Sequence, residues 1–334
     1  MGEDILRIEW NGGVHIEYDD VKVVLDPKRN SVNSSAFFVT HGHFDHSAAF
    51  RMKNIKKDSS KETLEIVSNF FSVKDSFPLN LKEKTAIGEV EVIPHNSGHV
   101  LGSFEYEVRT PEGTILYTGD FNTEKTKTMK PAEPIRCDVL IVEATFGSPN
   151  FVFPEMDEVG EDMTEWAKSV LRRGRIPVFR ADPLGNAQEI IRIFNECGIP
   201  VITHRRVTLM NRIYDRHGYA LEYIDEWSSE AEAIKQHGGF VYVAPKNAKI
   251  SDARFEGALV SGWALWSRRT GFPLSDHADF PRIIRFVEEC DPKIVLTCHG
   301  GRFNETLARY IERKMHIRAY PIDLIPTRFR KEER

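Results

Sequence analysis

The sequence predicts an α/β protein, on three observations. Short apolar runs separated by turns fill the first half of the chain, which is typical of strands. From about Asp157, helix-like and strand-like segments alternate, which is typical of βαβ units and a parallel sheet. Apolar runs that end on Asp or His recur at Asp26, Asp120 and His299, so the predicted sheets present polar side chains along an edge.

The spacing of apolar residues places the elements after the first strands. Residues 51–61 are polar and basic, which favours a helix and a surface loop. Ile190, Ile191 and Phe194 share one face of an amphipathic helix. The predicted elements are helices at 166–173, 184–197, from about 207 and at 230–236, strands at 176–180, 199–203 and 240–243, and, within 281–334, a helix, a strand ending at His299 and closing elements.

One loop concentrates metal-binding side chains directly after the apolar run 36–39. It reads His41-Gly-His43-Phe-Asp45-His46. Imidazole and carboxylate ligands suit Zn²⁺, with Mn²⁺ or Fe as rivals. His41 and His43 alternate and can face one ion, and Asp45 and His46 can face a second. The spacing therefore predicts two metal ions.

A single loop cannot complete two coordination spheres, so further ligands are expected downstream. His99 lies in a glycine-flanked loop after the apolar run 90–93. Asp120 and His299 each follow an apolar run. These three residues complete the predicted donor set.

This ordered series resembles the pattern of the metallo-β-lactamase superfamily. The resemblance implies a four-layer αββα sandwich with a dinuclear zinc site at one edge. It also implies that Asp26 orients a ligand imidazole without binding metal itself. The implied ligands are His41, His43 and His99 for one ion, Asp45, His46 and His299 for the other, and Asp120 bridging both.

Three further segments narrow the resemblance to the β-CASP nucleases of this superfamily. Glu143, His277 and His299 match motifs A, B and C of that branch. Hydrolysis of a phosphodiester needs an activated water and a proton for the leaving oxygen. The resemblance makes His277 the proton donor and Glu143 the carboxylate that keeps His277 protonated, while Asp45 and Asp120 serve catalysis through the metals.

The chain most resembles the short β-CASP branch, which includes ligase-associated DNA exonucleases and archaeal RNA 3′-end processing factors. This implies a nuclease for single-stranded nucleic acid, expected to be a 5′-to-3′ exonuclease in DNA repair. Two alternatives stay open: an RNA endonuclease or exonuclease in 3′-end processing, and a catalytically weak scaffold of a repair or RNA-processing complex. The predicted substrate-binding residues are Ser261, Gly262, Trp263, Arg268, Arg269 and Ser275.

The resemblance also predicts how the 334 residues are divided. Residues 1–150 and 271–334 would form the metallo-β-lactamase domain, and 151–270 an inserted β-CASP cap. Hydrophobic residues make up 41% and charged residues 28%, and no apolar run is long enough to span a membrane. The four cysteines show no CxxC pair, which favours reduced thiols and a cytoplasmic location.

The net charge of −5 is evidence against a large non-specific nucleic-acid footprint. A nuclease needs only a local basic track. The candidates are Arg268 and Arg269, which lie between Ser-Gly-Trp and His277, Arg205 and Arg206, also in the predicted cap, and Lys53, Lys56 and Lys57 beside the metal loop. The expected partners are single-stranded DNA or RNA and a repair or RNA-processing protein, with no membrane. The sequence does not predict the oligomeric state.

Overall fold

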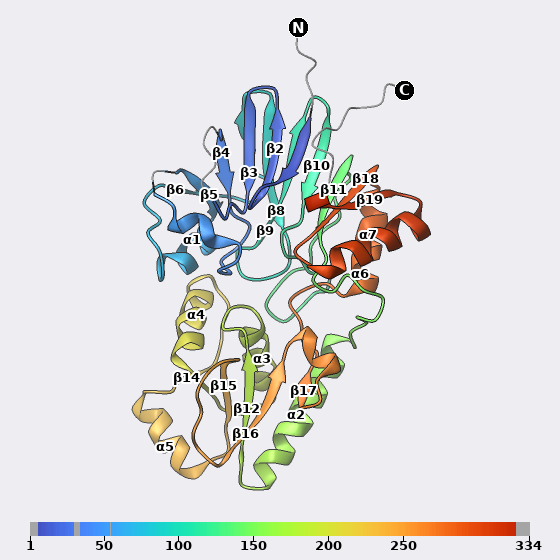
Figure 1. The fold of residues 1–334 in the computed structure, drawn as a ribbon. Coiled ribbons are helices and arrows are strands. Elements are labelled where there is room, and N and C mark those ends of the chain that lie inside the picture. Colours follow the sequence, from blue (N-terminus) through green and yellow to red (C-terminus); the bar gives the residue numbers. More distant parts are fainter. Residues whose placement is uncertain (1–5, 30–33, 54, 325–334) are drawn as a thin grey trace. The chain divides into compact units, whose positions relative to one another are not determined.

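The computed structural model describes residues 6–29, 34–53 and 55–324 (Figure 1). Contacts between Cα atoms divide the chain into two compact units. The first unit comprises residues 1–124, 131–151 and 277–334, and the second comprises 125–130 and 152–276. Most of the second unit is therefore an insertion between two parts of the first.

The first unit contains a six-stranded sheet in which the strands follow chain order. The first three strands pair antiparallel, and the third to the sixth pair parallel. The strands are β1 (Arg7–Trp10), β2 (Val14–Tyr18), β3 (Val21–Leu25), β4 (Ala36–Phe38), β5 (Lys57–Ser60) and β6 (Ser76–Leu79).

A seven-stranded sheet completes the strands of this unit, in the order β19-β18-β11-β10-β9-β8-β7. The strands from β19 to β10 pair parallel, and those from β10 to β7 pair antiparallel. In chain order they are β7 (Thr85–Ile87), β8 (Val90–Asn96), β9 (Phe104–Thr110), β10 (Gly113–Tyr117), β11 (Val139–Glu143), β18 (Ile294–Cys298) and β19 (Arg318–Pro321).

The two sheets share one hydrophobic core and so pack face to face. Val23 and Leu25 of β3 contribute to this core together with Tyr106 of β9 and Ile141 of β11. Val24, between the first two, joins a separate cluster with Phe37, because neighbouring residues of a strand point to opposite faces. The face of the first sheet that lies away from the shared core is therefore also apolar and needs a cover.

Helices supply that cover. The 3-10 helix η1 (Ser47–Arg51) and α1 (Lys61–Ser68) pack on the end of β4 through a cluster that includes Val39, Phe50 and Val67. Beside the second sheet lie α6 (Phe280–Cys290) and α7 (Arg302–Met315), and α7 contacts β18 and β19 (Figure 1). The chain continues from β19 into the 3-10 helix η3 (Ile322–Leu324).

Local sequence sets where several helices begin. Ser60 caps α1 by accepting a hydrogen bond from Thr63 N, and Asp279 caps α6 by accepting one from Arg282 N. Pro281 occupies the first turn of α6, where its missing N–H costs nothing. These side chains satisfy backbone donors that the helix itself leaves without a partner.

The second unit is built on a fully parallel six-stranded sheet, in the order β14-β13-β15-β12-β16-β17. Its strands are β12 (Ile176–Ala181), β13 (Val201–Thr203), β14 (Ile224–Asp225), β15 (Val241–Pro245), β16 (Phe255–Val260) and β17 (Gly271–Phe272). The helices are α2 (Met156–Arg172), α3 (Asn186–Glu196), α4 (Arg205–Arg216), α5 (Ser229–His237) and the 3-10 helix η2 (Gly262–Trp266).

The α/β class predicted from the sequence is confirmed, including the parallel sheet after Asp157. Two predicted elements are wrong in detail. The helix predicted at 166–173 begins at Met156, and the segment predicted as helix and surface loop at 51–61 contains strand β5. Among the described helices, none has the length and apolar content needed to cross a membrane.

Candidate metal centre

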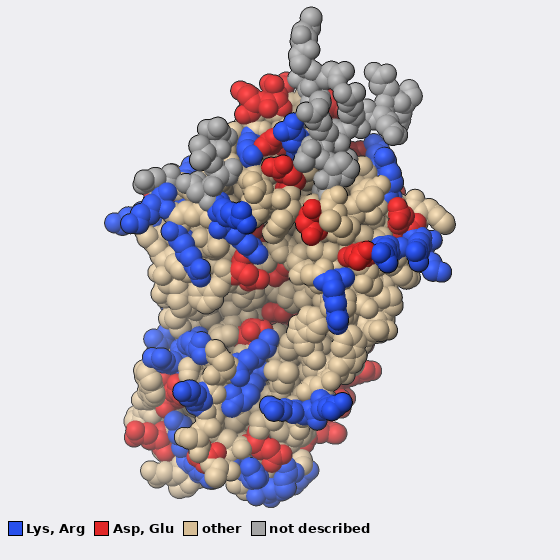
Figure 2. All heavy atoms as spheres, viewed as in Figure 1, with Lys and Arg blue, Asp and Glu red and all other residues tan. Residues whose placement is uncertain are grey.

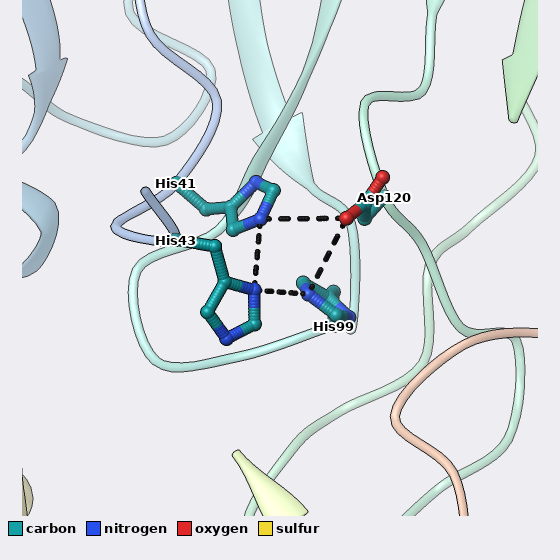
Figure 3. A group of neighbouring side chains, drawn as sticks. All are labelled: His41, His43, His99 and Asp120. Atoms are coloured by element: carbon teal, nitrogen blue, oxygen red, sulfur yellow. Dashed lines mark hydrogen bonds and ion pairs between the residues drawn. The ribbon is translucent and has the colours of Figure 1, made fainter. Parts of the chain in front are cut away.

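Four side chains in the first unit point their donor atoms at a common position (Figure 3). His43 Nδ1 lies 3.1 Å from His41 Nε2 and 3.1 Å from His99 Nε2. Asp120 Oδ2 lies 3.5 Å from His41 Nε2 and 3.8 Å from His99 Nε2. The structure thus brings together four residues from three distant stretches of the chain, all of them predicted ligands.

The spacing of these atoms suits a tetrahedral metal ion. Ligand atoms placed about 2.0–2.1 Å from Zn²⁺ at tetrahedral angles lie about 3.3–3.4 Å apart. The four observed separations fall on both sides of that value. Three imidazoles and one carboxylate also have the chemistry that zinc prefers. The residues present therefore fit a divalent metal ion.

Strand ends deliver these ligands. His41 is the third residue after β4, and His99 lies in the loop after β8. Asp120 follows β10 through Gly119, which has φ 55°. A Cβ atom at Gly119 would lie 2.7 Å from Thr40 Cγ2, so only glycine allows the Asp120 turn to approach the His41 loop this closely.

Asp26 holds the metal loop, residues 41–46, through hydrogen bonds to Thr40 and His46. Its Oδ1 accepts a hydrogen bond from Thr40 N at 2.8 Å, and its Oδ2 accepts one from Thr40 Oγ1 at 2.8 Å. Asp26 Oδ2 also lies 2.7 Å from His46 Nδ1. Because His46 Nδ1 is occupied in this way, its Nε2 faces Asp120 Oδ1, 3.3 Å away. This contact is the one expected of a carboxylate that orients a ligand imidazole.

The predicted second set of ligands is gathered less closely. Asp45 Oδ2 lies 3.7 Å from His46 Nε2, and the Asp45 side chain is 69% exposed. The rings of His46 and His299 lie 4.7 Å apart. In the first set, all ligand atoms lie within 4.8 Å of one another. Among the described residues, the ligand atoms of Asp45, His46, Asp120 and His299 do not form such a group. A second metal ion stays a prediction.

Charges inside the cluster compensate one another. Burial alone would raise the pKa of Asp120, but the imidazole of His46 and its neighbours lower it well below the usual range. Burial would lower the pKa of His46, yet the carboxylates of Asp120 and Asp26 raise it well above its ordinary value. Burial lowers the pKa of His41 well below its ordinary value. Asp120 is thus held ionised and His41 neutral, the forms in which these two groups bind a cation, whereas in the metal-free cluster the two carboxylates favour the protonated form of His46.

Tyr117, which sequence reasoning missed, connects Asp26 to His299. Its hydroxyl donates to Asp26 Oδ2 at 2.9 Å and lies 2.8 Å from His299 Nε2. Burial raises the pKa of Tyr117 well above its usual range, so the hydroxyl keeps its single hydrogen. Burial lowers the pKa of His299 to about 4, so the imidazole is neutral. His299 Nε2–H then donates to the tyrosine oxygen, which leaves Nδ1 as the ring nitrogen able to bind a metal.

Replacing Tyr117 with phenylalanine removes both hydrogen bonds and leaves the aromatic ring in the core. We expect metal affinity to fall by about 10- to 100-fold, because the orientation and tautomer of His299 are no longer fixed. Titration of the metal-free protein with zinc against a competing chelator measures the change. Tyr106→Phe is the matched control, since that buried hydroxyl donates to Val39 O at 2.9 Å. Equal zinc affinity in the two variants would contradict this role for Tyr117.

Glu143 and His277 meet beside the ligand cluster, as the sequence predicts for a catalytic pair. Glu143 ends β11, and its two oxygens lie 3.0 Å and 2.9 Å from His277 Nδ1. Phe121 N donates to Glu143 Oε1 at 2.8 Å, and the Thr145 hydroxyl donates to Oε2. Burial raises the pKa of Glu143, and His277 opposes that shift. The His277 ring lies 4.5 Å from that of His99.

The predicted substrate-binding residues all lie in the second unit. Ser261 is buried and precedes η2, which contains Gly262 and Trp263. Trp263 is exposed, and so are Arg268 and Arg269 in the turn between η2 and β17. Ser275 is buried in the segment after β17. Their roles in substrate binding stay predictions.

Comparison with known proteins adds relatives and a fold neighbour. No family model matches the chain. A probable DNA ligase of Opitutus terrae is 28% identical over 285 residues, which are 81% of this chain and 27% of that protein. An RNase J-like protein of Methanocaldococcus jannaschii is 29% identical over 216 residues, which are 54% of this chain and 51% of that protein.

The solved structures include one with the same fold. It is the crystal structure of a protein of unknown function from Enterococcus faecalis, with a TM-score of 0.66 over 98% of this chain and 99% of that chain. At 14% identity this likeness concerns the fold alone. The named relatives and the ordered donor residues together show that the chain resembles the β-CASP branch of the metallo-β-lactamase superfamily, as its sequence predicts.

Proposed function

We propose that this protein is a metal-dependent nuclease that hydrolyses phosphodiester bonds of single-stranded nucleic acid. The observation that carries the proposal is the Glu143–His277 pair beside the cluster of His41, His43, His99 and Asp120. A metal cluster alone suits many hydrolases of this fold. A positioned carboxylate–imidazole pair next to the cluster supplies the proton donor that a departing alkoxide needs.

The two residues of the pair have different roles: Glu143 positions His277, and His277 donates the proton. Glu143 accepts a hydrogen bond from His277 Nδ1, which fixes the ring and favours its protonated form. His277 then presents Nε2 to the substrate and donates a proton to the leaving oxygen. When bound, a divalent metal would neutralise charge on the phosphate oxygens and lower the pKa of a water molecule.

We infer that the metal is zinc and that two ions bind. His41, His43 and His99 would hold the first ion, and Asp45, His46 and His299 the second, with Asp120 between them. The donor chemistry supports zinc, although Mn²⁺ and Fe accept the same ligands. The first unit would be the αββα metallo-β-lactamase sandwich, and the second, predicted at residues 151–270, the β-CASP cap.

The nature of the nucleic acid is proposed from the relatives. The name of the RNase J-like protein supports RNA as substrate, and that of the probable DNA ligase supports a role with DNA. The chain spans about half of the first protein and about a quarter of the second. We propose RNA processing and DNA repair as the two settings, the first as RNA hydrolysis and the second as 5′-to-3′ exonuclease action.

Surface charge fits a local track for the substrate. On the face that Figure 2 shows, basic and acidic side chains are interspersed over both units. Of the lysines predicted beside the metal loop, Lys53 and Lys56 are exposed. Lys57 is buried and donates to Met52 O at 2.8 Å, so it is not available to phosphate. A short basic stretch beside the metal loop would hold only a few phosphates of the strand.

Comparison of end-labelled RNA and DNA of one sequence tests the proposal. We expect cleavage of at least one polymer, and the size of the first labelled product gives the polarity. Release of mononucleotides from the 5′ end would establish the exonuclease, and internal fragments would favour an RNA endonuclease. If the metal-loaded protein leaves both polymers intact, the protein is not a nuclease and the scaffold role takes its place.

We infer a terminal-phosphate pocket at Ser261, Gly262 and Trp263, which predicts a preference for phosphorylated ends. Charge-assisted hydrogen bonds to the phosphate would be lost with a 5′ hydroxyl, so we expect degradation to slow by about tenfold or more. Matched oligonucleotides with either end, assayed with the same preparation, measure the ratio. Equal rates on the two ends would argue against the pocket.

A further inference from the structure

Three phenylalanine rings gather on the surface of the first unit, beside the metal loop. Phe44 is 54% exposed and Phe70 is 47% exposed. The ring of Phe44 lies 5.1 Å from that of Phe70 and 6.0 Å from that of Phe71. Single exposed apolar residues are common on protein surfaces, but neighbouring exposed rings mark an interaction site. We call Phe44, Phe70 and Phe71 the phenylalanine platform.

The platform is held in place by its backbone and by the core beneath it. Phe70 N and Phe71 N both donate to Val67 O, at 2.9 Å and 2.8 Å, at the end of α1. Phe71 is only partly buried and packs on the cluster of Val39, Ala49, Phe50 and Val67. These contacts fix the backbone that carries Phe70 and Phe71 and hold the ring of Phe71, so ligand binding has less conformational entropy left to remove there.

The position of Phe44 ties the platform to the metal centre. Phe44 lies between His43 and Asp45 in the chain, and both are predicted ligands. His43 Nδ1 points into the donor cluster, while the Phe44 ring is turned to solvent. The loop that presents His43 to the donor cluster therefore also presents the Phe44 ring to solvent.

Positive charge lies beside the rings. The exposed guanidinium of Arg51 lies 5.4 Å from the centre of the Phe71 ring, and Lys53, also exposed, follows two residues later in the chain. Flat aromatic faces next to cations match a single-stranded nucleic acid, in which flat bases alternate with anionic phosphates. An apolar protein partner would be matched by the rings but not by the two cations.

We propose that the phenylalanine platform stacks a nucleobase of the single-stranded substrate next to the phosphate that is cleaved. This inference rests on the proposed nuclease function and adds to it a base-binding site. Stacking on a ring requires only the π-face that every base has, so the site would accept any sequence. Arg51 and Lys53 would contact the backbone phosphates on either side of the stacked base.

Two alanine variants and a base-deletion series test the proposal. Phe44→Ala removes the ring in the metal loop, and Phe70→Ala removes a ring outside it. We expect each to raise KM for a single-stranded oligonucleotide by about tenfold, since base stacking on an aromatic side chain contributes that much or more. Phe44→Tyr keeps the ring and should restore the wild-type KM. Tyr320→Ala, which removes a 37% exposed ring in β19, is the control and should behave as wild type.

The same oligonucleotide with one abasic nucleotide, moved along the strand, identifies the stacked base. For the wild type, KM should rise when the abasic nucleotide occupies one particular position of the strand. On that strand, neither alanine substitution should raise KM any further. Equal losses on base-bearing and abasic strands would mean damage to the metal centre and would overturn the proposal. Normal cleavage by both alanine variants would overturn it as well and assign the platform to a protein partner. Failure of the wild type to cleave any strand would instead remove the nuclease function itself.

Discussion

Replacing His277 with alanine is expected to leave the metal content unchanged and to reduce phosphodiester cleavage by about 10²–10⁴-fold. His277 Nδ1 contacts Glu143, and His277 lies close to His99 and Asp120 but is not one of the four gathered donors His41, His43, His99 and Asp120. Loss of the imidazole therefore removes the proton donor and spares these four residues. Elemental analysis and initial rates on one labelled oligonucleotide measure the two quantities.

Glu143→Gln tests whether the charge of Glu143 is needed to keep His277 protonated. The amide keeps the size of the side chain and can still accept hydrogen bonds, but it no longer carries the charge that favours protonated His277. We expect the rate to fall with the metal content intact, and the double variant to be little worse than His277→Ala alone because the two residues act together. An unchanged rate in His277→Ala would remove this residue from the mechanism.

Replacing Asp120 with asparagine is expected to lower the occupancy of both proposed metal ions and to abolish most of the activity. Asp120 Oδ2 faces His41 and His99, and Asp120 Oδ1 faces His46. One carboxylate therefore contacts residues of both predicted ligand sets. Metal content measured after dialysis against a weak chelator reports the loss.

Asp45→Asn separates a two-metal site from a one-metal site. Asp45 is predicted to bind only the second ion, so its replacement should remove at most one ion per chain. Asp252→Asn, at a partly exposed carboxylate paired with Arg254, should keep the wild-type content. Full metal content in Asp120→Asn would contradict its predicted bridging position.

Much of the fold follows from local sequence because apolar periodicity and strand ends are visible in it. The apolar runs before Asp26, Asp120 and His299 form β3, β10 and β18. Strand β5 could not be recognised in this way, since Lys57–Ser60 carries no apolar residue. Its side chains are buried because they bond to other elements, as in Ser59 Oγ to Val39 O at 2.7 Å. Only the tertiary structure shows such partners.

The donor cluster was visible in sequence because its residue types are rare at strand ends. The residues that support the cluster were not, because their types are ordinary where they occur. Tyr117 reads as one more large residue of a buried strand, and Thr40 as a strand end. The structure gives both a role, since each contacts Asp26 Oδ2. Their partner Asp26 lies 14 and 91 residues away in the chain, so a local sequence pattern could not predict these contacts.

Two of the six non-glycine residues with positive φ in the described part of the chain lie at this site. Asp26 has φ 48° and His299 has φ 59°, in the left-handed region that residues other than glycine rarely adopt. Each residue lies directly after a strand, and both contact Tyr117. Such conformations persist only where surrounding contacts hold them, and they concentrate at functional sites. The hydrogen bonds around Asp26 provide those contacts.

The measurement that tests the nuclease function most directly is metal reconstitution followed by cleavage. Metal-free protein is titrated with zinc and assayed at each step on end-labelled single-stranded RNA and DNA, beside His277→Ala prepared in the same way. We predict that the rate of cleavage of at least one polymer rises with bound zinc in the wild type. At the same zinc content, the rate in the variant should be at least about 100-fold lower. Intact RNA and DNA after full zinc loading of the wild type, or equal rates in the two proteins, would contradict the account.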